Sequence, residues 1–351
     1  MRYLFAMRAR LADVARQAGV SEATVSRVLN GRAGVSTEAR QAVLTALDVL
    51  GYERPERLHT RSAGLVGLVV AELENPIFPM FAQVIEGALA QHGYTPVLCS
   101  RPPGGVAEDE YVEMLLDRGV SGIIFVSGLH ADTTTGPERY QKLVARGLPI
   151  VLINGYMPGI EAPFVSIDHR AAGDIAVSHL ASLGHRRIGL ISGPRRYLPV
   201  QRTQAGHAAA MRRLFDVSDE ELDELTALSL FGVEGGQAAA DRLLDRGITG
   251  IVCGSDMMAL GAIRAARQRG LSVPDDVSVV GQDDSPLMAF TEPALTTVRH
   301  PVQPMSVAAV RALMDEVRGE GSPHDEYLFR PELTVRESTA PPAAVAAAHI
   351  A

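Results

Sequence analysis

Residues 11–30 read LADVARQAGVSEATVSRVLN and form the most informative segment of the chain. The pattern predicts a short helix that ends at Gly19, since glycine accepts the left-handed backbone found at many helix C-termini. Its apolar face consists of residues at helical spacing, namely Leu11, Val14, Ala15 and Ala18. We therefore expect a first helix that packs through one side.

A second short helix is expected directly after the turn. Val20 is the apolar residue of the turn, and Ser21 is a good N-cap because its hydroxyl can accept an orphan backbone N–H. Val25, Val28 and Leu29 then face the first helix. The residues left on or near the outward face are Glu22, Ala23, Thr24, Ser26 and Arg27. This is the layout of a helix-turn-helix, whose second helix presents its N-terminal residues to DNA bases.

A third helix is predicted over residues 37–50, with Ser36 as its cap and Gly51 as its stop. Its expected apolar face is made of Ala39, Val43, Leu44, Leu47 and Leu50. Three helices in about 40 residues form only a small core. Such a domain gains stability from dimerisation and from DNA.

The charge distribution fits a basic head on an acidic body. The whole chain of 351 residues has a formal net charge of −8, which is unusual for a DNA-binding protein. Residues 1–62, however, carry ten arginines against six acidic residues, and the rest carries 23 basic and 35 acidic residues. Phosphate contact is therefore expected from the head alone.

Composition excludes several other classes of protein. No apolar run reaches the roughly 20 residues of a membrane helix, and the N-terminus lacks the apolar run and cleavage site of a signal peptide. Met7 is an alternative start to Met1. Cys99 and Cys253 end separate apolar runs, which favours two buried free thiols over a disulfide or metal pair. These observations predict a soluble cytoplasmic protein.

From residue 65 onward, apolar runs alternate with amphipathic helical segments. Predicted strands cover residues 65–73, 95–100, 122–127, 149–155, 165–168, 187–192, 227–230, 250–255 and 277–284. Predicted helices cover residues 81–92, 108–118, 140–147, 171–183, 203–215, 236–246 and 257–269. Repeated strand–helix–strand units give parallel sheets covered by helices. Two such series, the second beginning at residue 165, predict an α/β body of two similar subdomains. Ligands in such folds bind at the C-terminal strand ends, which would face each other across a cleft.

Enzyme classes find little support. The chain has no phosphate-binding loop, no GxGxxG after a strand and no GxSxG elbow. Its ten histidines include no HExxH, and none lies near cysteine at ligand spacing. His169, His179 and His185 are explained as helix-surface or turn residues. No catalytic residue, cofactor or metal site is predicted.

The ordered motifs of the chain resemble those of the LacI/GalR family of bacterial transcription regulators. In the head these are ADVARQAGVS, TVSRVLNG, VSTEAR and LGY. In the body they are GLVVAELENPIF, SIDHRAAG, LASLGHRRIGLISGP, CGSDMMALGAIRAARQRGLSVPDDVSVVGQDD and PALTTVRHP, which also resemble the family's periplasmic sugar-binding relatives. The resemblance covers nearly the whole chain. It implies an all-α helix-turn-helix headpiece joined to a two-lobed body of the periplasmic-binding-protein type I.

The resemblance and the head pattern together define the expected DNA contacts. Arg27 is the main candidate for a base or phosphate contact, and Glu22 and Ala23 occupy positions that help select the operator in the family. Glu22 can accept from a cytosine amino group, or simply favour a helix N-terminus by its charge. The remaining expected DNA-binding residues are Leu11, Ser21, Thr24, Ser26, Asn30 and Leu58. Leu58 corresponds to the leucine that such proteins wedge into the minor groove. The segment between Tyr52 and Leu58 is about three residues shorter than in the family, so the hinge helix is short or absent.

The expected effector site lies at the strand ends. Asn75, Ile77 and Phe78 follow the first strand, and Phe78 either stacks on a sugar ring or belongs to the core. Asp283 matches a ligand-binding aspartate of the family, whereas its neighbour Asp284 is a structural acceptor or helix cap. The other expected effector-binding residues are Gln201, Arg202, Phe231 and Ser255. Ser255 replaces a frequent asparagine, so its contact would pass through a water.

One departure from the family concerns a ligand-binding arginine. The family often has it three residues before the glycine that is here Gly206, where this chain has Thr203. Gln201 or Arg202 is the expected substitute.

The predicted domains follow from these patterns. The headpiece spans residues 8–52, the hinge 53–63 and the body 64–338. The N-subdomain covers 64–163 and 296–323, the C-subdomain covers 164–295 and 324–338, and residues 339–351 form a disordered tail. The predicted function is that of a repressor that binds a palindromic operator as a homodimer, with a tetramer as the alternative assembly, under control of a sugar-like effector. The alternative is a sugar-binding receptor without DNA binding.

Overall fold

The computed structural model describes residues 10–29, 34–52, 63–101 and 104–342 and divides the chain into two compact units. The first unit holds α1 (Leu11–Ala18), α2 (Glu22–Leu29) and α3 (Thr37–Val49). Their apolar faces meet in one small core centred on Val14, Val25 and Val43, all fully buried. The three predicted helices are confirmed, with one correction. Leu44 is 48% exposed, because Val43 occupies the core position and the next residue is rotated about 100° away.

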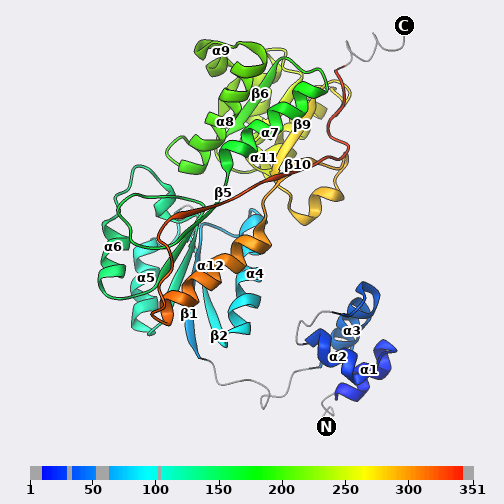
Figure 1. The fold of residues 1–351 in the computed structure, drawn as a ribbon. Helices are drawn as coiled ribbons and strands as arrows, with labels where there is room; N and C mark the ends of the chain where they lie inside the picture. The colour runs from blue at the N-terminus through cyan, green and yellow to red at the C-terminus, as the bar shows by residue number, and fades with distance from the viewer. Residues whose placement is uncertain (1–9, 30–33, 53–62, 102–103, 343–351) are drawn as a thin grey trace, which may run out of the picture. The chain divides into compact units, whose positions relative to one another are not determined.

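The second unit contains two lobes, each built on a six-stranded sheet (Figure 1). The first sheet is parallel throughout, and its strands in order are β11 (Glu326–Phe329), β5 (Phe164–Ile167), β4 (Ile150–Ile153), β3 (Gly122–Val126), β1 (Gly64–Val70) and β2 (Tyr94–Ser100). The second has an antiparallel edge strand, and its order is β12 (Glu332–Thr334), β10 (Thr296–Arg299), β9 (Ser278–Asp283), β8 (Gly250–Cys253), β6 (Ile188–Ser192) and β7 (Thr226–Leu228). The predicted pair of parallel α/β subdomains is confirmed.

Helices cover both faces of the first sheet. One face carries α4 (Ile77–Gln91) and α12 (Val302–Val317), and the other carries α5 (Glu108–Asp117) and α6 (Glu138–Ala145). Alternate residues of β1 separate the two cores, since Leu68 faces the first pair and Val69 faces the second. A strand with both faces buried has a continuous apolar sequence, and this is why the apolar run at residues 65–70 predicts a strand. The strand ends at Val70 and not at residue 73 as predicted.

In the second lobe, helices pack in close pairs. The elements are α7 (His169–Ser182), α8 (Leu198–Phe215), α9 (Asp219–Glu224), α10 (Val233–Leu244) and α11 (Asp256–Gln268). At the contact of α7 with α8, a Cβ on Gly206 would lie 2.0 Å from the carbonyl oxygen of Arg170. At the contact of α10 with α11, a Cβ on Gly261 would lie 2.1 Å from the carbonyl oxygen of Val233. Glycine is thus required for the close approach of both helix pairs.

Two helices begin earlier than the sequence pattern indicated. Residues 77–80 belong to α4 and residues 198–202 belong to α8, although both segments contain a proline. Proline is compatible with a first helical turn, because the N–H that it lacks would have no partner there. Asn75 consequently lies just before the first turn of α4, and Gln201 lies in the first turn of α8.

The sheet order corrects the predicted subdomain limits. β5 pairs with β4 in the first sheet, β10 pairs with β9 in the second, and β11 pairs with β5 in the first. Within the described residues of the body, the chain therefore crosses between lobes three times, after β5, after β10 and between β11 and β12. Strand content alone could not assign these segments, because short apolar strands fit either sheet equally well.

The C-terminal segment also differs from its prediction. Ser338 is fully buried and its hydroxyl donates to the carbonyl of Val279 at 2.6 Å. Thr339 and Ala340 bond to His179 and His185 of the second lobe. Residues 339 and 340 are therefore part of the folded lobe, because their polar atoms satisfy two histidines.

The glycine contacts generate a stability prediction. Gly261→Ala should lower the free energy of unfolding by about 1–3 kcal/mol, since the new methyl must displace the backbone of α10. Gly87→Ala in α4 is the control, because no atom lies within 4 Å of its added Cβ. We expect that variant to be neutral or more stable by up to about 1 kcal/mol. Denaturant unfolding measures both, and equal stability of the two variants would contradict the packing argument.

Candidate DNA-binding and effector-binding sites

The turn between α1 and α2 has the expected geometry. Gly19 has a φ of 65°, and its N–H closes the end of α1. The hydroxyl of Ser21 accepts the backbone N–H of Thr24 at 3.2 Å and lies 2.9 Å from the Thr24 hydroxyl. These bonds fix the start of α2 relative to the turn.

The N-terminal part of α2 leaves an exposed polar face. Ser21, Glu22, Ala23 and Arg27 are exposed, whereas Thr24 and Ser26 are half-buried. Leu11 is half-buried and packs on the headpiece core. The predicted contacts Asn30 and Leu58 lie outside the residues that the structure describes. The exposed face brings together a cation, a carboxylate and a hydroxyl, the groups that read base edges and phosphates.

In the body, a hydrogen bond joins the strand ends of the two lobes. The Asn75 side chain donates from Nδ2 to Asp283 Oδ2 at 3.4 Å, and its Oδ1 accepts the N–H of Ile77 at 3.2 Å. Asn75 lies just before α4 in the first lobe, and Asp283 ends β9 in the second. The structure thus brings together two of the residues predicted to bind an effector.

Asp283 is a buried carboxyl held in an unusual backbone conformation. It is 4% exposed, has a φ of 122°, and its Oδ1 lies 3.6 Å from His300 Nδ1. Burial, followed by the charge of Asp256, raises the pKa of Asp283 well above its ordinary value. A buried carboxyl with so few donors has capacity left to accept hydrogen bonds from hydroxyl groups.

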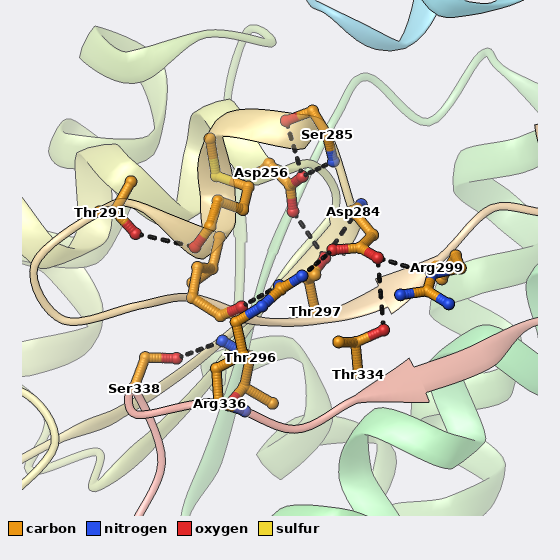
Figure 2. Close-up of polar contacts among 12 residues, drawn as sticks. Asp256, Asp284, Ser285, Thr291, Thr296, Thr297, Arg299, Thr334, Arg336 and Ser338 are labelled. Carbon is orange, nitrogen blue, oxygen red and sulfur yellow. Dashed lines mark hydrogen bonds and ion pairs between the residues drawn. The ribbon is translucent and has the colours of Figure 1, made fainter. Parts of the chain in front are cut away.

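The neighbouring Asp284 has a different role, as Figure 2 shows. Its carboxylate pairs with Arg336 Nη2 and with Arg299 Nε, each at 2.6 Å, and accepts the Thr334 hydroxyl at 3.3 Å. Burial alone would raise the pKa of Asp284, but the two arginines outweigh it and lower the pKa. The prediction that Asp284 is a structural acceptor is confirmed.

Ser255 and Asp256 organise the start of α11. Ser255 caps the helix by accepting the N–H of Met258 at 3.2 Å and is 2% exposed. The buried Asp256 accepts the Thr297 hydroxyl at 2.6 Å and the Ser285 N–H at 2.8 Å (Figure 2). Burial raises the pKa of Asp256 to about 6. Besides accepting the Met258 N–H, the Ser255 hydroxyl can donate one hydrogen bond and accept one more.

Arg202 and Gln201 both bridge the lobes. The Arg202 guanidinium binds Glu326 of β11 through two bonds of 2.6 and 2.8 Å. Gln201 Nε2 donates to the carbonyl of Arg195 at 2.7 Å and to the Thr133 hydroxyl at 3.2 Å. Gln201 or Arg202 is the predicted substitute for an effector-binding arginine. In the structure, the Arg202 guanidinium instead forms an ion pair with Glu326 of the other lobe.

The predicted apolar residues of the site divide into two groups. Ile77 is 4% exposed and Phe78 is half-buried, and both pack in the core of the first lobe. Phe231 is 45% exposed, and its ring covers Gly193, where a Cβ would lie 2.4 Å from the ring. Phe231 is therefore the more available flat surface.

Buried histidines were missed by the sequence reasoning. His169 and His300 lie at two of the crossings between lobes, are 4% and 7% exposed, and both approach Gln282 Nε2, at 3.4 and 2.9 Å. His185 is also buried and bonds to Thr249 and Ser278. Burial lowers the pKa of His300 to about 4. The prediction of a helix-surface or turn position was wrong for His169, because a neutral imidazole can be buried when hydroxyl or amide partners lie beside it. His185 does follow the turn after α7 but is buried too, and His179 is half-buried.

The described residues offer neither a metal site nor a membrane-spanning helix. Residues 10–29, 34–52, 63–101 and 104–342 hold no cluster of three or more His, Cys, Asp or Glu side chains suited to a metal ion. None of the described helices is long and apolar enough to span a bilayer. Cys99 and Cys253 are buried free thiols, as predicted.

Comparison with known proteins identifies the family. Residues 10–55 match the model for bacterial regulatory proteins of the lacI family, and residues 177–339 match a periplasmic binding protein-like domain. The HTH-type transcriptional regulator MalR of Streptomyces coelicolor is 62% identical over 335 residues, which cover 95% of this chain and 97% of that protein. The chain belongs to the LacI family of bacterial transcriptional regulators, and its curated relatives are named as regulators and not as enzymes.

Solved structures agree with this assignment over both domains. A complex of the transcriptional regulator CelR with cellobiose has a TM-score of 0.70 and 32% identity, covering 94% of this chain and all of that chain. The lac repressor dimer bound to operator and an anti-inducer has a TM-score of 0.68 and 26% identity, covering 95% of this chain and all of that chain.

The contrast between the adjacent aspartates generates a prediction. Asp284→Asn should lower the free energy of unfolding by about 2–3 kcal/mol, because it weakens both arginine pairs in a largely buried place. The loss should be full at neutral pH and should shrink as the pH falls through the lowered pKa of Asp284.

Asp223→Asn is the control, since Asp223 forms an exposed pair with Arg195 and is 77% exposed. It should leave stability almost unchanged. Thermal unfolding at several pH values measures both variants, and an Asp284 variant as stable as the control at neutral pH would contradict the structural role.

Proposed function

We propose that this protein is a transcriptional repressor that binds a two-fold operator as a homodimer, and that a sugar bound between the lobes sets its affinity for DNA. The observation that carries the proposal is the joint presence of the exposed α2 face and of a body whose lobes meet at Asn75 and Asp283. The proposed place of action is the cytoplasm, where the DNA lies.

The DNA half of the proposal rests on the headpiece. Two copies of α2 would enter successive major grooves, about 34–36 Å apart if the half-sites are separated by one turn. Arg27 would contact a base or phosphate, Glu22 and Ala23 would help select the sequence, and Ser21, Thr24 and Ser26 would position the helix. The lac repressor dimer on its operator supports this arrangement through its similarity over both domains.

The effector half rests on the cleft. Asp283 would accept sugar hydroxyl protons, Phe231 would supply a flat apolar wall, and Asn75, Gln201 and Ser255 would add polar contacts. The similarity to a regulator solved with cellobiose favours a sugar. A sugar that stabilises one lobe arrangement more than the other would change the spacing of the two headpieces. We propose no direct sugar contact for Arg202, which Glu326 engages.

The operator prediction concerns Arg27. Arg27→Ala should cost about 1–3 kcal/mol of binding free energy in each half-site, so the dimer should bind its operator at least about 30-fold more weakly. The operator used here is the two-fold site that the wild type selects from a random-sequence DNA pool. Gel retardation at fixed salt measures the loss, and circular dichroism checks the fold.

Arg16→Ala is the matched control, because Arg16 is 79% exposed on α1 and carries the same charge. It should weaken binding only slightly and equally for all DNA sequences. Specific retardation by Arg27→Ala equal to that of the wild type would overturn the proposed interface, as would failure of the wild type to select any site.

The effector prediction concerns Asp283. At a pH above the raised pKa of Asp283, Asp283→Asn should weaken binding of a sugar by about 10- to 100-fold, since it removes a charged acceptor. The panel consists of cellobiose, maltose, D-ribose and D-glucose, and calorimetry measures the affinities. Binding by the wild type should also weaken as the pH falls through the raised pKa of Asp283.

Stability separates this effect from misfolding. The pKa of Asp283 is raised in the folded state, which means that its ionised carboxylate destabilises the fold. Asp283→Asn removes this cost and should therefore not lower the melting temperature at neutral pH. A folded variant with undiminished sugar affinity would exclude Asp283 from the site. Absence of sugar binding by the wild type across the panel would contradict the proposed effector class.

A further inference from the structure

A short segment of each lobe forms a further connection between the lobes, which we call the rim latch and define as Asp132, Thr133, Arg196 and Tyr197. The backbone N–H and the hydroxyl of Thr133 both donate to the carbonyl of Arg196, each at 2.8 Å. Asp132 and Tyr197 pair as an isolated antiparallel bridge. The connection thus has a backbone component that does not depend on long side chains.

An ion pair reinforces these backbone bonds. Asp132 Oδ2 lies 3.2 Å from Arg196 Nε, and the carboxylate side chain is only 8% exposed. Its other oxygen accepts the N–H and the hydroxyl of Thr134 at 3.0 and 2.6 Å. Arg196 donates to the Tyr197 hydroxyl at 2.8 Å and lies over the Tyr197 ring. Each charged group is therefore also held by a partner within its own lobe.

In the first lobe, a buried network of hydrogen bonds holds the segment that precedes the rim latch. Glu108 is 1% exposed and accepts the Tyr140 hydroxyl at 2.5 Å and the Leu129 N–H at 3.0 Å. The Tyr140 hydroxyl in turn accepts the N–H of His130 at 2.9 Å. This network fixes the short 3-10 helix Leu129–Ala131 that leads into Asp132. Asp132 is consequently held by the folded core and not by a free loop.

The latch lies away from the chain crossings. Its first segment follows β3, which β4 separates from the crossing strand β5. Its second segment follows β6, which β8 and β9 separate from the crossing strand β10. A contact far from a hinge resists opening more effectively than an equal contact beside it. The nearby Arg202–Glu326 pair, by contrast, involves β11, itself a crossing strand.

We propose that the rim latch holds the two lobes closed and thereby sets how fast a bound sugar leaves the cleft. The part of the inference that concerns sugar rests on the proposed function, whereas the closure itself does not. If the latch favours the closed state, its loss increases the open population and speeds release of anything enclosed.

The test uses the full-length protein and the variants Asp132→Asn, Arg196→Gln and their combination. Amide hydrogen exchange, followed by mass spectrometry on peptides that contain Thr133, reports opening without any ligand. We expect faster exchange in each single variant and no further increase in the combination, because either substitution breaks the same ion pair. The release rate of the panel sugar with the lowest Kd should rise about 3- to 30-fold.

The matched control is Arg195→Gln with Asp223→Asn. These residues form an ion pair of 3.2 Å that lies entirely within the second lobe, one residue from Arg196. The control should leave both exchange and sugar release unchanged, whereas equal effects of control and latch variants would indicate a general charge effect and overturn the proposal.

Amide exchange at Thr133 tests whether the rim latch holds the lobes together, and this test does not require an effector. Unchanged Thr133 exchange in both single variants would overturn it, as would independent, multiplicative effects of the two substitutions. If the wild type binds no panel sugar, the effector proposal fails while the exchange data still decide whether the lobes are latched.

Discussion

The three crossings of the chain between the lobes constrain every other feature of the body. They lie at one side of each sheet, after β5, after β10 and between β11 and β12. Any movement of one lobe against the other must therefore pivot near these segments. Polar groups that join the lobes elsewhere, such as Asn75 with Asp283, are the contacts that a ligand between the lobes can exchange for its own.

The adjacent carboxyls of Asp283 and Asp284 show how one turn separates binding from structure. Both residues have positive φ angles, 122° and 57°, which few side chains adopt without support. Asp284 supplies that support through two arginines, one on β10 and one beyond β12. Asp283 is left with an incomplete set of donors in a buried place. The two neighbours thus differ because the ion pairs of Asp284 occupy its carboxylate, whereas Asp283 keeps capacity to accept further hydrogen bonds.

The sequence was sufficient where local rules act. Gly19, Ser21 and Ser36 marked helix ends correctly, because capping depends on residues close in sequence. The assignment of β5 to the wrong subdomain and of His169 to the surface failed, since both depend on partners far along the chain. Arg202 illustrates the same limit within the site, because its partner Glu326 lies 124 residues away. Family motifs indicated Asp283, but no local pattern identifies the latch.

The glycines between the helices of the second lobe also affect how this protein can change over time. With backbone against backbone at Gly206 and Gly261, neither helix pair has space for a larger residue at these positions. New ligand preferences must then arise in the loops at the strand ends, where side chains such as Phe231 remain exposed. The helix packing of this lobe would therefore stay constant during evolution, while substitutions in its loops change which ligand is bound.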